Sequence, residues 1–159
     1  LAGDQSPEWL SWRHALDHLK ASEGELPDAM LSVPATAPLR SRADLENCLD
    51  EYEKGDVDVV ITVTEAHRSP YFNMVKENTD GTVGLVIPLQ TSIARRQDSP
   101  AVFDMATVAY VVRPEFVFSN TSTFEGRVRA VQIPSKRAID IDTLLDFQIA
   151  EYLLGVGED

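Results

Sequence analysis

The chain has 159 residues, enough for one domain with a substantial core, and its apolar and charged fractions of 43% and 25% are ordinary for a globular protein. Its 14 basic and 26 acidic residues give a formal net charge of −12, which argues against general nucleic-acid binding because that requires a basic surface. No apolar stretch approaches the roughly 20 residues that cross a bilayer, and no signal peptide is evident, so a cytoplasmic protein that does not bind membranes is expected.

The first segments predict a helix followed by a strand. Ser6 and Pro7 form a helix start, with Ser6 as the N-cap and Pro7 at the first helical position, where its missing N–H costs nothing. Apolar residues at helical spacing then predict a buried face over about 14 residues. That face comprises Trp9, Trp12, Leu16 and Leu19. Residues 29–33 are short and apolar and end at Pro34, as expected of a buried strand that leads into a loop.

Residues 29–63 predict a βαβ unit. Ser41 caps the second predicted helix, and Asp44 stands three residues later in the place of a capping-box acid. Gly55 ends this helix, whose buried face comprises Leu45, Cys48, Leu49 and Tyr52. Residues 57–63 are β-branched and nearly continuous, which predicts a central strand reached by a right-handed crossover.

Residues 65–105 are polar and rich in turn signals, and they predict an excursion from the sheet that contains a hairpin. Strands are expected again at residues 108–112 and 127–133. A last helix is expected over residues 142–154, ended by Gly155, with Leu145, Ile149, Ala150 and Leu153 facing inward. The predicted fold class is α/β with a mostly parallel sheet.

The most informative run for chemistry is residues 139–143. If this run is extended, Asp140 and Asp142 project to the same side while the two isoleucines pack the other way. Two such carboxylates at the mouth of a sheet suit Mg²⁺, which shares its remaining positions with water and substrate phosphates. The alternative is that Asp142 caps the last helix and Asp140 is a surface acid.

Other chemistry-bearing residues give weaker signals. Adjacent Arg95 and Arg96 could bind a phosphate or carboxylate through bidentate hydrogen bonds, or form a solvated charge pair in a loop. The single cysteine, Cys48, lies on an apolar helix face and is expected in the core. The histidines lack a metal-binding frame, and the sequence has no P-loop, Gly-x-Ser-x-Gly or Gly-x-Gly-x-x-Gly motif.

Four segments, in chain order, resemble motifs of the acylneuraminate cytidylyltransferases, or CMP-sialic acid synthetases. Residues 35–40 resemble the family's Pro-Thr-Ser-Pro-Leu-Arg loop, and residues 65–71 resemble the segment that leads into its dimerisation arm. Residues 95–98 resemble the Arg-Arg-Gln run of that arm. Residues 140–143, followed by Asp146, resemble the family's metal-binding Asp-x-Asp motif. The resemblance covers nearly the whole chain, and four ordered motifs are more specific than any single one.

This resemblance implies a reaction in which the anomeric hydroxyl of an acidic nine-carbon sugar attacks the α-phosphorus of CTP and pyrophosphate leaves. It implies that Asp140 and Asp142 are catalytic residues that hold Mg²⁺. The family pattern assigns substrate binding to five further residues, namely Arg40, Arg96, Gln97, Tyr110 and Phe124. Arg96 would reach across a subunit interface, so a homodimer is expected.

The resemblance also implies a three-layer sheet of the nucleotide-diphospho-sugar transferase type. Residues 1–64 and 106–159 would form the α/β domain, with its N-terminal part missing, and residues 65–105 would form a small protruding dimerisation arm. The glycine- and lysine-containing loop that holds the triphosphate in the family is absent, and the chain starts at Leu1. We therefore expect the C-terminal two-thirds of such an enzyme, which by itself could be inactive.

Several departures from the family pattern concern the sugar. Pro34 stands where many members have glutamine, Ala106 and Thr107 replace an Asn-Gly pair, and Thr123 replaces one of two paired aromatic residues. These departures favour a related nonulosonic acid over sialic acid. Two other classes remain open from the sequence: a non-catalytic sugar- or partner-binding module derived from this fold, and a phosphatase-like hydrolase with Asp140 as nucleophile.

Overall fold

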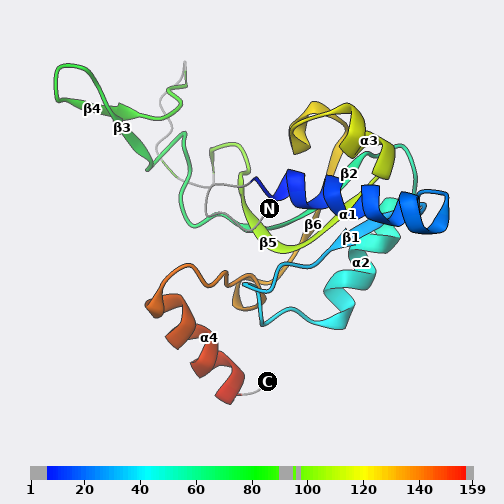
Figure 1. Cartoon of the computed structure of the whole chain (residues 1–159). Helices are drawn as coiled ribbons and strands as arrows, with labels where there is room; N and C mark the ends of the chain where they lie inside the picture. The colour runs from blue at the N-terminus through cyan, green and yellow to red at the C-terminus, as the bar shows by residue number, and fades with distance from the viewer. Residues whose placement is uncertain (1–6, 90–94, 96–97, 157–159) are drawn as a thin grey trace.

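The computed structural model describes residues 7–89, 95 and 98–156, which fold around a four-stranded sheet (Figure 1). The strands lie in the order β1-β5-β2-β6. Their bounds are Met30–Ser32 for β1, Val59–Glu65 for β2, Phe103–Val112 for β5 and Val128–Gln132 for β6. Each strand expected in the main sheet is present, and β5 begins at residue 103 where the apolar pattern indicated residue 108.

The prediction of a mostly parallel sheet is wrong. Strand β5 pairs antiparallel with both β1 and β2, whereas β2 and β6 pair in parallel. Because β1 and β2 both run opposite to β5, the two run in the same direction, and β6 shares it. A buried strand between two neighbours is apolar on both faces whichever way it runs, so the sequence pattern did not reveal the reversal of β5.

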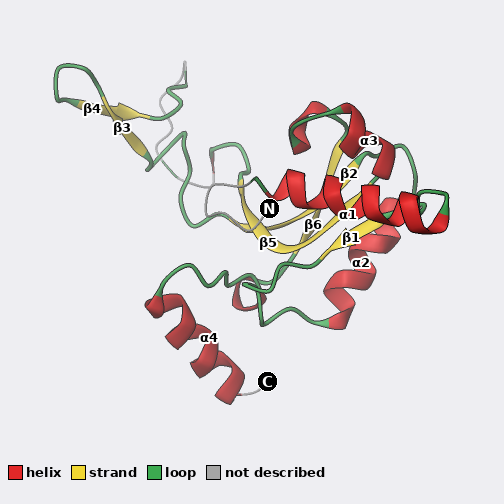
Figure 2. Ribbon diagram, in the orientation of Figure 1, coloured by secondary structure: helices red, strands yellow, loops and turns green. Residues whose placement is uncertain are grey.

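One face of the sheet is covered by α1 (Glu8–Glu23) and α3 (Pro114–Ser119), which lie over the strands in Figure 2. Trp9, Trp12 and Leu16 of α1 pack against alternate residues of β2 and β5, as their helical spacing predicted. Leu19, assigned to the same face, is 39% exposed and lies beyond the edge of this core.

The opposite face is covered by α2 (Arg42–Glu53), so the domain has three layers. The predicted capping box is present: the backbone N–H of Asp44 donates to Ser41 Oγ at 3.3 Å, and the backbone N–H of Ser41 donates to Asp44 Oδ2 at 2.8 Å. Cys48 is fully buried against Val60 and Val111. The β1-α2-β2 segment therefore forms the expected crossover between two strands of the same direction, with β5 inserted between them.

A large bulge interrupts the pairing of β2 with β5. Ile61 lies opposite Tyr110, but the next residue, Thr62, lies opposite Ala106. The three intervening residues of β5 close around the hydroxyl of Thr62, which donates to the Ala106 carbonyl at 2.6 Å. The same hydroxyl accepts the backbone N–H groups of Val108 and Ala109 at 3.2 and 3.3 Å. One buried side chain thus satisfies the backbone groups that the bulge removes from the ladder.

The predicted hairpin consists of β3 (Val75–Glu77) and β4 (Val83–Leu85), which project away from the main sheet (Figure 1). Gly81 adopts a φ of 81° in the connecting turn, a conformation that favours glycine. Val75 and Val83 are 60% and 65% exposed, so the hairpin presents apolar side chains to its surroundings.

The last helix, α4 (Leu144–Val156), lies below the sheet and apart from the other helices in Figure 1. Ala150 is buried as expected, but Leu145 and Ile149 are 63% and 38% exposed, so their predicted inward orientation is wrong. Gly155 lies within the helix instead of ending it. Its apolar residues are spread around the helix and are not confined to one face. Among the described residues, no helix is long and apolar enough to cross a membrane.

Candidate active site

The candidate site lies where β1, β2 and β6 end. These three strands share one direction, so their carboxyl ends meet at a single edge, where ligands bind in open α/β sheets. The loop of residues 33–41 leaves β1 there, and the segment of residues 133–143 leaves β6 there. Both segments carry residues that the sequence singled out.

The loop of residues 33–41 is held in a fixed shape by its own arginine. The Arg40 guanidinium donates to the Pro34 carbonyl at 2.5 Å, which closes the loop, and Ala37 is fully buried beneath it. The loop also binds the other segment, because the backbone N–H of Ile141 donates to the Thr36 carbonyl at 2.8 Å. This bond places the residues on either side of Ile141, Asp140 and Asp142, beside the loop.

Asp140 and Asp142 occupy different environments. Asp140 is half-buried, and its Oδ1 atom is buried with no hydrogen-bond partner among the described residues. Asp142 is exposed at a bend, not in an extended strand. Asp142 is also not the residue that caps α4, because Thr143 and Asp146 make the capping hydrogen bonds at 2.6, 2.8 and 3.3 Å.

The unpaired oxygen of Asp140 fits a divalent cation. A buried carboxylate oxygen without a donor is costly, and a hard cation with oxygen ligands would satisfy it. The described residues contain no group of three or more His, Cys, Asp or Glu side chains that could hold a metal ion. Two carboxylates fit Mg²⁺, which takes one or two from a protein and fills its other positions with water and phosphate.

Tyr110 lies near this carboxylate but inside the core. It is 4% exposed and packs on Trp12 with ring centroids 5.2 Å apart. Burial, followed by the negative charges of Glu8 and Asp140, raises the pKa of Tyr110 to about 12, so its phenol stays protonated at neutral pH.

Glu8 and Ser32 add a polar cluster that the sequence did not suggest. The Glu8 carboxylate accepts from Trp12 Nε1 at 3.2 Å and from Ser32 Oγ at 3.1 Å. Glu8 opens the first helix and Ser32 ends β1, so their sequence signals are those of structural positions. Only the packing of α1 across the sheet brings them together.

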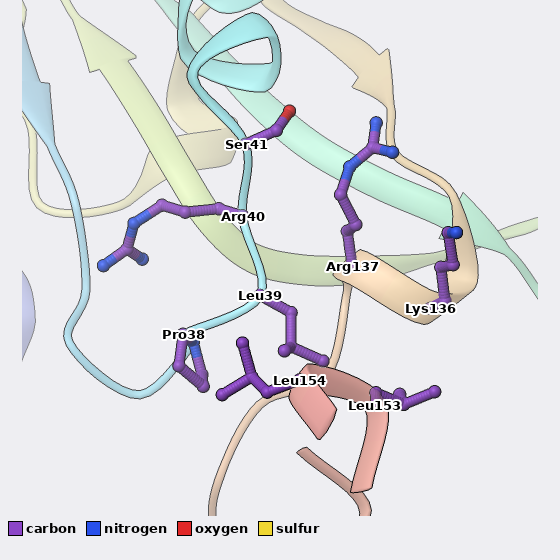
Figure 3. Close-up of a pocket in the computed structure, with 8 residues that line it drawn as sticks. All are labelled: Pro38, Leu39, Arg40, Ser41, Lys136, Arg137, Leu153 and Leu154. Carbon is purple, nitrogen blue, oxygen red and sulfur yellow. The ribbon is translucent and has the colours of Figure 1, made fainter. Parts of the chain in front are cut away.

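A pocket of about 420 Å³ lies between the loop, the segment after β6 and α4 (Figure 3). Arg40, Lys136 and Arg137 line it together with apolar residues, namely Pro38, Leu39, Leu153 and Leu154. Figure 3 shows Leu154 beside Leu39, and the Arg137 side chain running toward the start of α2 near Ser41. Arg137 is paired with Asp44 and the Arg40 guanidinium is turned to the Pro34 carbonyl, so the charges of these two lining residues are already engaged by protein groups.

Comparisons with known proteins agree with the motif pattern. No family model matches the chain. Over 127 residues it is 33% identical to post-translational flagellin modification protein B of Campylobacter coli, covering 80% of this chain and 53% of that protein. Over 156 residues it is 28% identical to CMP-N,N'-diacetyllegionaminic acid synthase of Campylobacter jejuni, covering 98% of this chain and 65% of the relative. These similarities support a CMP-sialic acid synthetase-like family for this chain.

The fold comparison is consistent with this assignment. A solved structure of 4-diphosphocytidyl-2C-methyl-D-erythritol synthase from Anaerococcus prevotii superposes with a TM-score of 0.65 over 95% of this chain and 68% of that one. Sequence identity is 15%, so this likeness concerns the fold alone. The chain spans between about half and two-thirds of the length of the curated relatives it matches.

The family's other motif residues are not all gathered at the site. Arg96 and Gln97 lie outside the described residues. Arg95 is exposed and pairs with Asp98 at 3.2 Å, as a loop charge pair does. Phe124 lies in a short 3-10 helix, η2 (Thr123–Glu125), and is 67% exposed. It precedes β6 whereas Asp140 follows that strand, so β6 separates the two in the fold.

Proposed function

We propose that this chain is part of a Mg²⁺-dependent cytidylyltransferase of the CMP-sialic acid synthetase type, which transfers CMP from CTP to the anomeric hydroxyl of an acidic nine-carbon sugar. The hydroxyl oxygen bonds to the α-phosphorus, the bond from that phosphorus to the pyrophosphate oxygen breaks, and the hydroxyl proton passes to solvent or a nearby base. The observation that carries this proposal is the buried, unpartnered Oδ1 of Asp140, in an Asp-x-Asp motif at the carboxyl edge of the sheet.

Each residue of the candidate site has a separate role in this proposal. Asp140 and Asp142 would hold the cation, which when bound screens the triphosphate charge and lowers the pKa of the attacking hydroxyl. Arg40, fixed against Pro34, keeps the loop of residues 33–41 in shape and lines the pocket between that loop and α4. Tyr110 stays neutral and packs against Trp12 in the core.

The sugar we propose is a nonulosonic acid of the legionaminic type. One relative is named for a CMP-diacetyllegionaminic acid product, and its match spans 98% of this chain. Pro34 and Ala106 each stand where the family pattern has an amide side chain, Gln or Asn, and Thr107 adds a hydroxyl where that pattern has glycine. Ala106 and Thr107 are also part of the bulge in β5, so their backbone already has a structural role.

We also propose that residues 65–105 form a dimerisation arm, so that the working enzyme is a cytoplasmic homodimer. The support is the projecting β3–β4 hairpin, on which Val75 and Val83 are largely exposed. Light scattering is expected to give twice the chain mass of 17.6 kDa, and the double substitution Val75→Glu and Val83→Lys is expected to give the monomer mass. A monomer in the unmodified chain would contradict the arm's proposed role.

The test of the enzymatic proposal is pyrophosphate release from CTP and Mg²⁺ with a panel of nonulosonic acids. Asp142→Asn is expected to abolish release, and Asp50→Asn, an exposed carboxylate on α2, is the matched control and is expected to leave it unchanged. Two results together would favour the binding-module alternative. The first is sugar binding that changes neither with Mg²⁺ nor with Asp142→Asn, and the second is the absence of pyrophosphate release by a form of the protein extended upstream of Leu1.

A further inference from the structure

The segment that carries the two aspartates is tied to the start of α2 by a buried ion pair. Arg137 ends the short 3-10 helix η3 (Ser135–Arg137), three residues before Asp140. Its Nε donates to Asp44 Oδ2 and its Nη2 donates to Asp44 Oδ1, both at 2.9 Å. A bidentate pair of this kind fixes the direction of the guanidinium as well as its distance.

Asp44 is a rigid anchor for this contact. It is 1% exposed, and its carboxylate also accepts the Ser41 backbone N–H of the capping box. Burial alone would raise the pKa of Asp44, but the hydrogen bonds from Arg137 and from Ser41 outweigh it and hold the pKa below its usual range. The anchor is therefore ionised at neutral pH and fully hydrogen-bonded on both oxygens.

Two further bonds hold the segment beyond Arg137. The backbone N–H of Ile141 donates to the Thr36 carbonyl at 2.8 Å, and Thr143 and Asp146 cap the start of α4. Asp140 thus lies between the Arg137 and Ile141 anchors, and Asp142 lies between the Ile141 and Thr143 anchors. Neither aspartate lies in a helix or strand, so no sheet ladder or helical hydrogen bonding fixes its position directly.

We propose that Arg137 and Asp44 are positioning residues that hold the Asp140–Asp142 segment in the geometry that binds the catalytic cation. The inference rests on the proposed function, because it assigns the support of the same metal site. The two residues act through the backbone of residues 138–140. Supporting contacts of this kind typically contribute about 10–100-fold to metal affinity when they orient a ligand.

The test measures binding of Mn²⁺ to the full chain by electron paramagnetic resonance, with no nucleotide or sugar present. Arg137→Lys keeps the positive charge but loses the bidentate fork, and Asp44→Asn keeps the shape but loses the charge. Both variants are expected to weaken Mn²⁺ binding by about 10-fold or more. Asp140→Asn and Asp142→Asn are measured alongside, and each is expected to remove most of the binding.

A matched control separates positioning from general destabilisation. Arg113→Lys disrupts another arginine–aspartate pair, with Asp58, at the opposite edge of the sheet where β2 begins and β5 ends. Mn²⁺ titrations are run at a temperature at which circular dichroism shows every variant to be folded. Arg113→Lys is expected to leave Mn²⁺ affinity unchanged whatever it costs in stability.

The outcomes distinguish the positioning role of Arg137 and Asp44 from the existence of the metal site itself. Unchanged Mn²⁺ affinity in Arg137→Lys and Asp44→Asn, with loss in the Asp140 and Asp142 variants, would overturn the positioning role and leave the metal site intact. Unchanged affinity in Asp140→Asn and Asp142→Asn would overturn the metal site of the proposed function itself. Equal weakening in Arg113→Lys and Arg137→Lys would show that the ion pair supports only the fold.

Discussion

The hydroxyl of Thr62 is the single group on which the bulge in the central strand pair depends, and replacing it with a methyl tests that interpretation. Thr62→Val changes the shape of the side chain very little and makes it more apolar. Thr62 is fully buried, so water cannot replace the lost partner. The Ala106 carbonyl and the N–H groups of Val108 and Ala109 would lose a hydrogen bond together.

The expected cost follows from the number of groups left without this partner. A buried donor or acceptor without a hydrogen bond costs about 1–3 kcal/mol. Because the three backbone groups share one hydroxyl, their costs do not add in full, and we expect the free energy of unfolding to fall by about 2–5 kcal/mol. Thr62→Ser keeps the hydroxyl and removes one methyl group, which costs about 1 kcal/mol. The more apolar substitution is therefore expected to be the more damaging one.

Urea unfolding monitored by tryptophan fluorescence measures both variants, because Trp9 and Trp12 are buried in the core on this sheet. The slope of the free energy of unfolding against urea should stay constant, so that the shift in midpoint reports stability. A Thr62→Val protein as stable as the Thr62→Ser protein would refute the argument. It would mean that the bulge satisfies its backbone groups without the threonine.

Three further predictions concern single residues. Burial and, to a lesser degree, the nearby Asp44 carboxylate raise the pKa of Cys48 to about 11. A disulfide reagent at pH 8 should therefore react slowly with the folded chain, and it should label one thiol per chain once urea has unfolded the protein. Rapid labelling of the folded chain would contradict this burial. Because the folded pKa of Asp44 lies below the unfolded value of about 3.9, its stabilising contribution is complete above that pH and is lost as the pH falls through the folded pKa. The difference in unfolding free energy between the wild type and Asp44→Asn should therefore be constant from about pH 5 to 8 and shrink below about pH 4; a difference that grows on acidification would reverse the sign. A Cβ atom at Gly126 would lie 2.4 Å from Phe116 Cε2, so Gly126→Ala should reduce the free energy of unfolding by about 1–3 kcal/mol through overpacking and lower the thermal midpoint. The control is Gly155→Ala in α4, where a Cβ atom would meet nothing within 4 Å, and it should not lower the midpoint.

Local signals in the sequence were sufficient for most of the elements. The capping box of Ser41 and Asp44, the helical spacing of Trp9, Trp12 and Leu16, and the β-branched run before Thr64 depend on neighbours within a few residues. These interactions form in the same way whatever the rest of the chain does. The Asp-x-Asp motif and the loop ending at Arg40 were likewise identified from adjacent residues.

Contacts between distant segments were decided only by the tertiary structure. The reversed direction of β5, the bulge around Thr62 and the pairing of Arg137 with Asp44 each join residues at least 38 positions apart. An apolar run predicts a buried strand but not whether the strand runs parallel or antiparallel to its neighbours. An arginine in a loop likewise does not reveal which acidic residue it pairs with. The sequence by itself predicted Asp140 and Asp142 as the carboxylates that would hold a metal. Only the packing of α2 beside the end of β6 decided that Arg137 meets Asp44, because these residues are 93 positions apart and come within hydrogen-bond distance only in the folded chain.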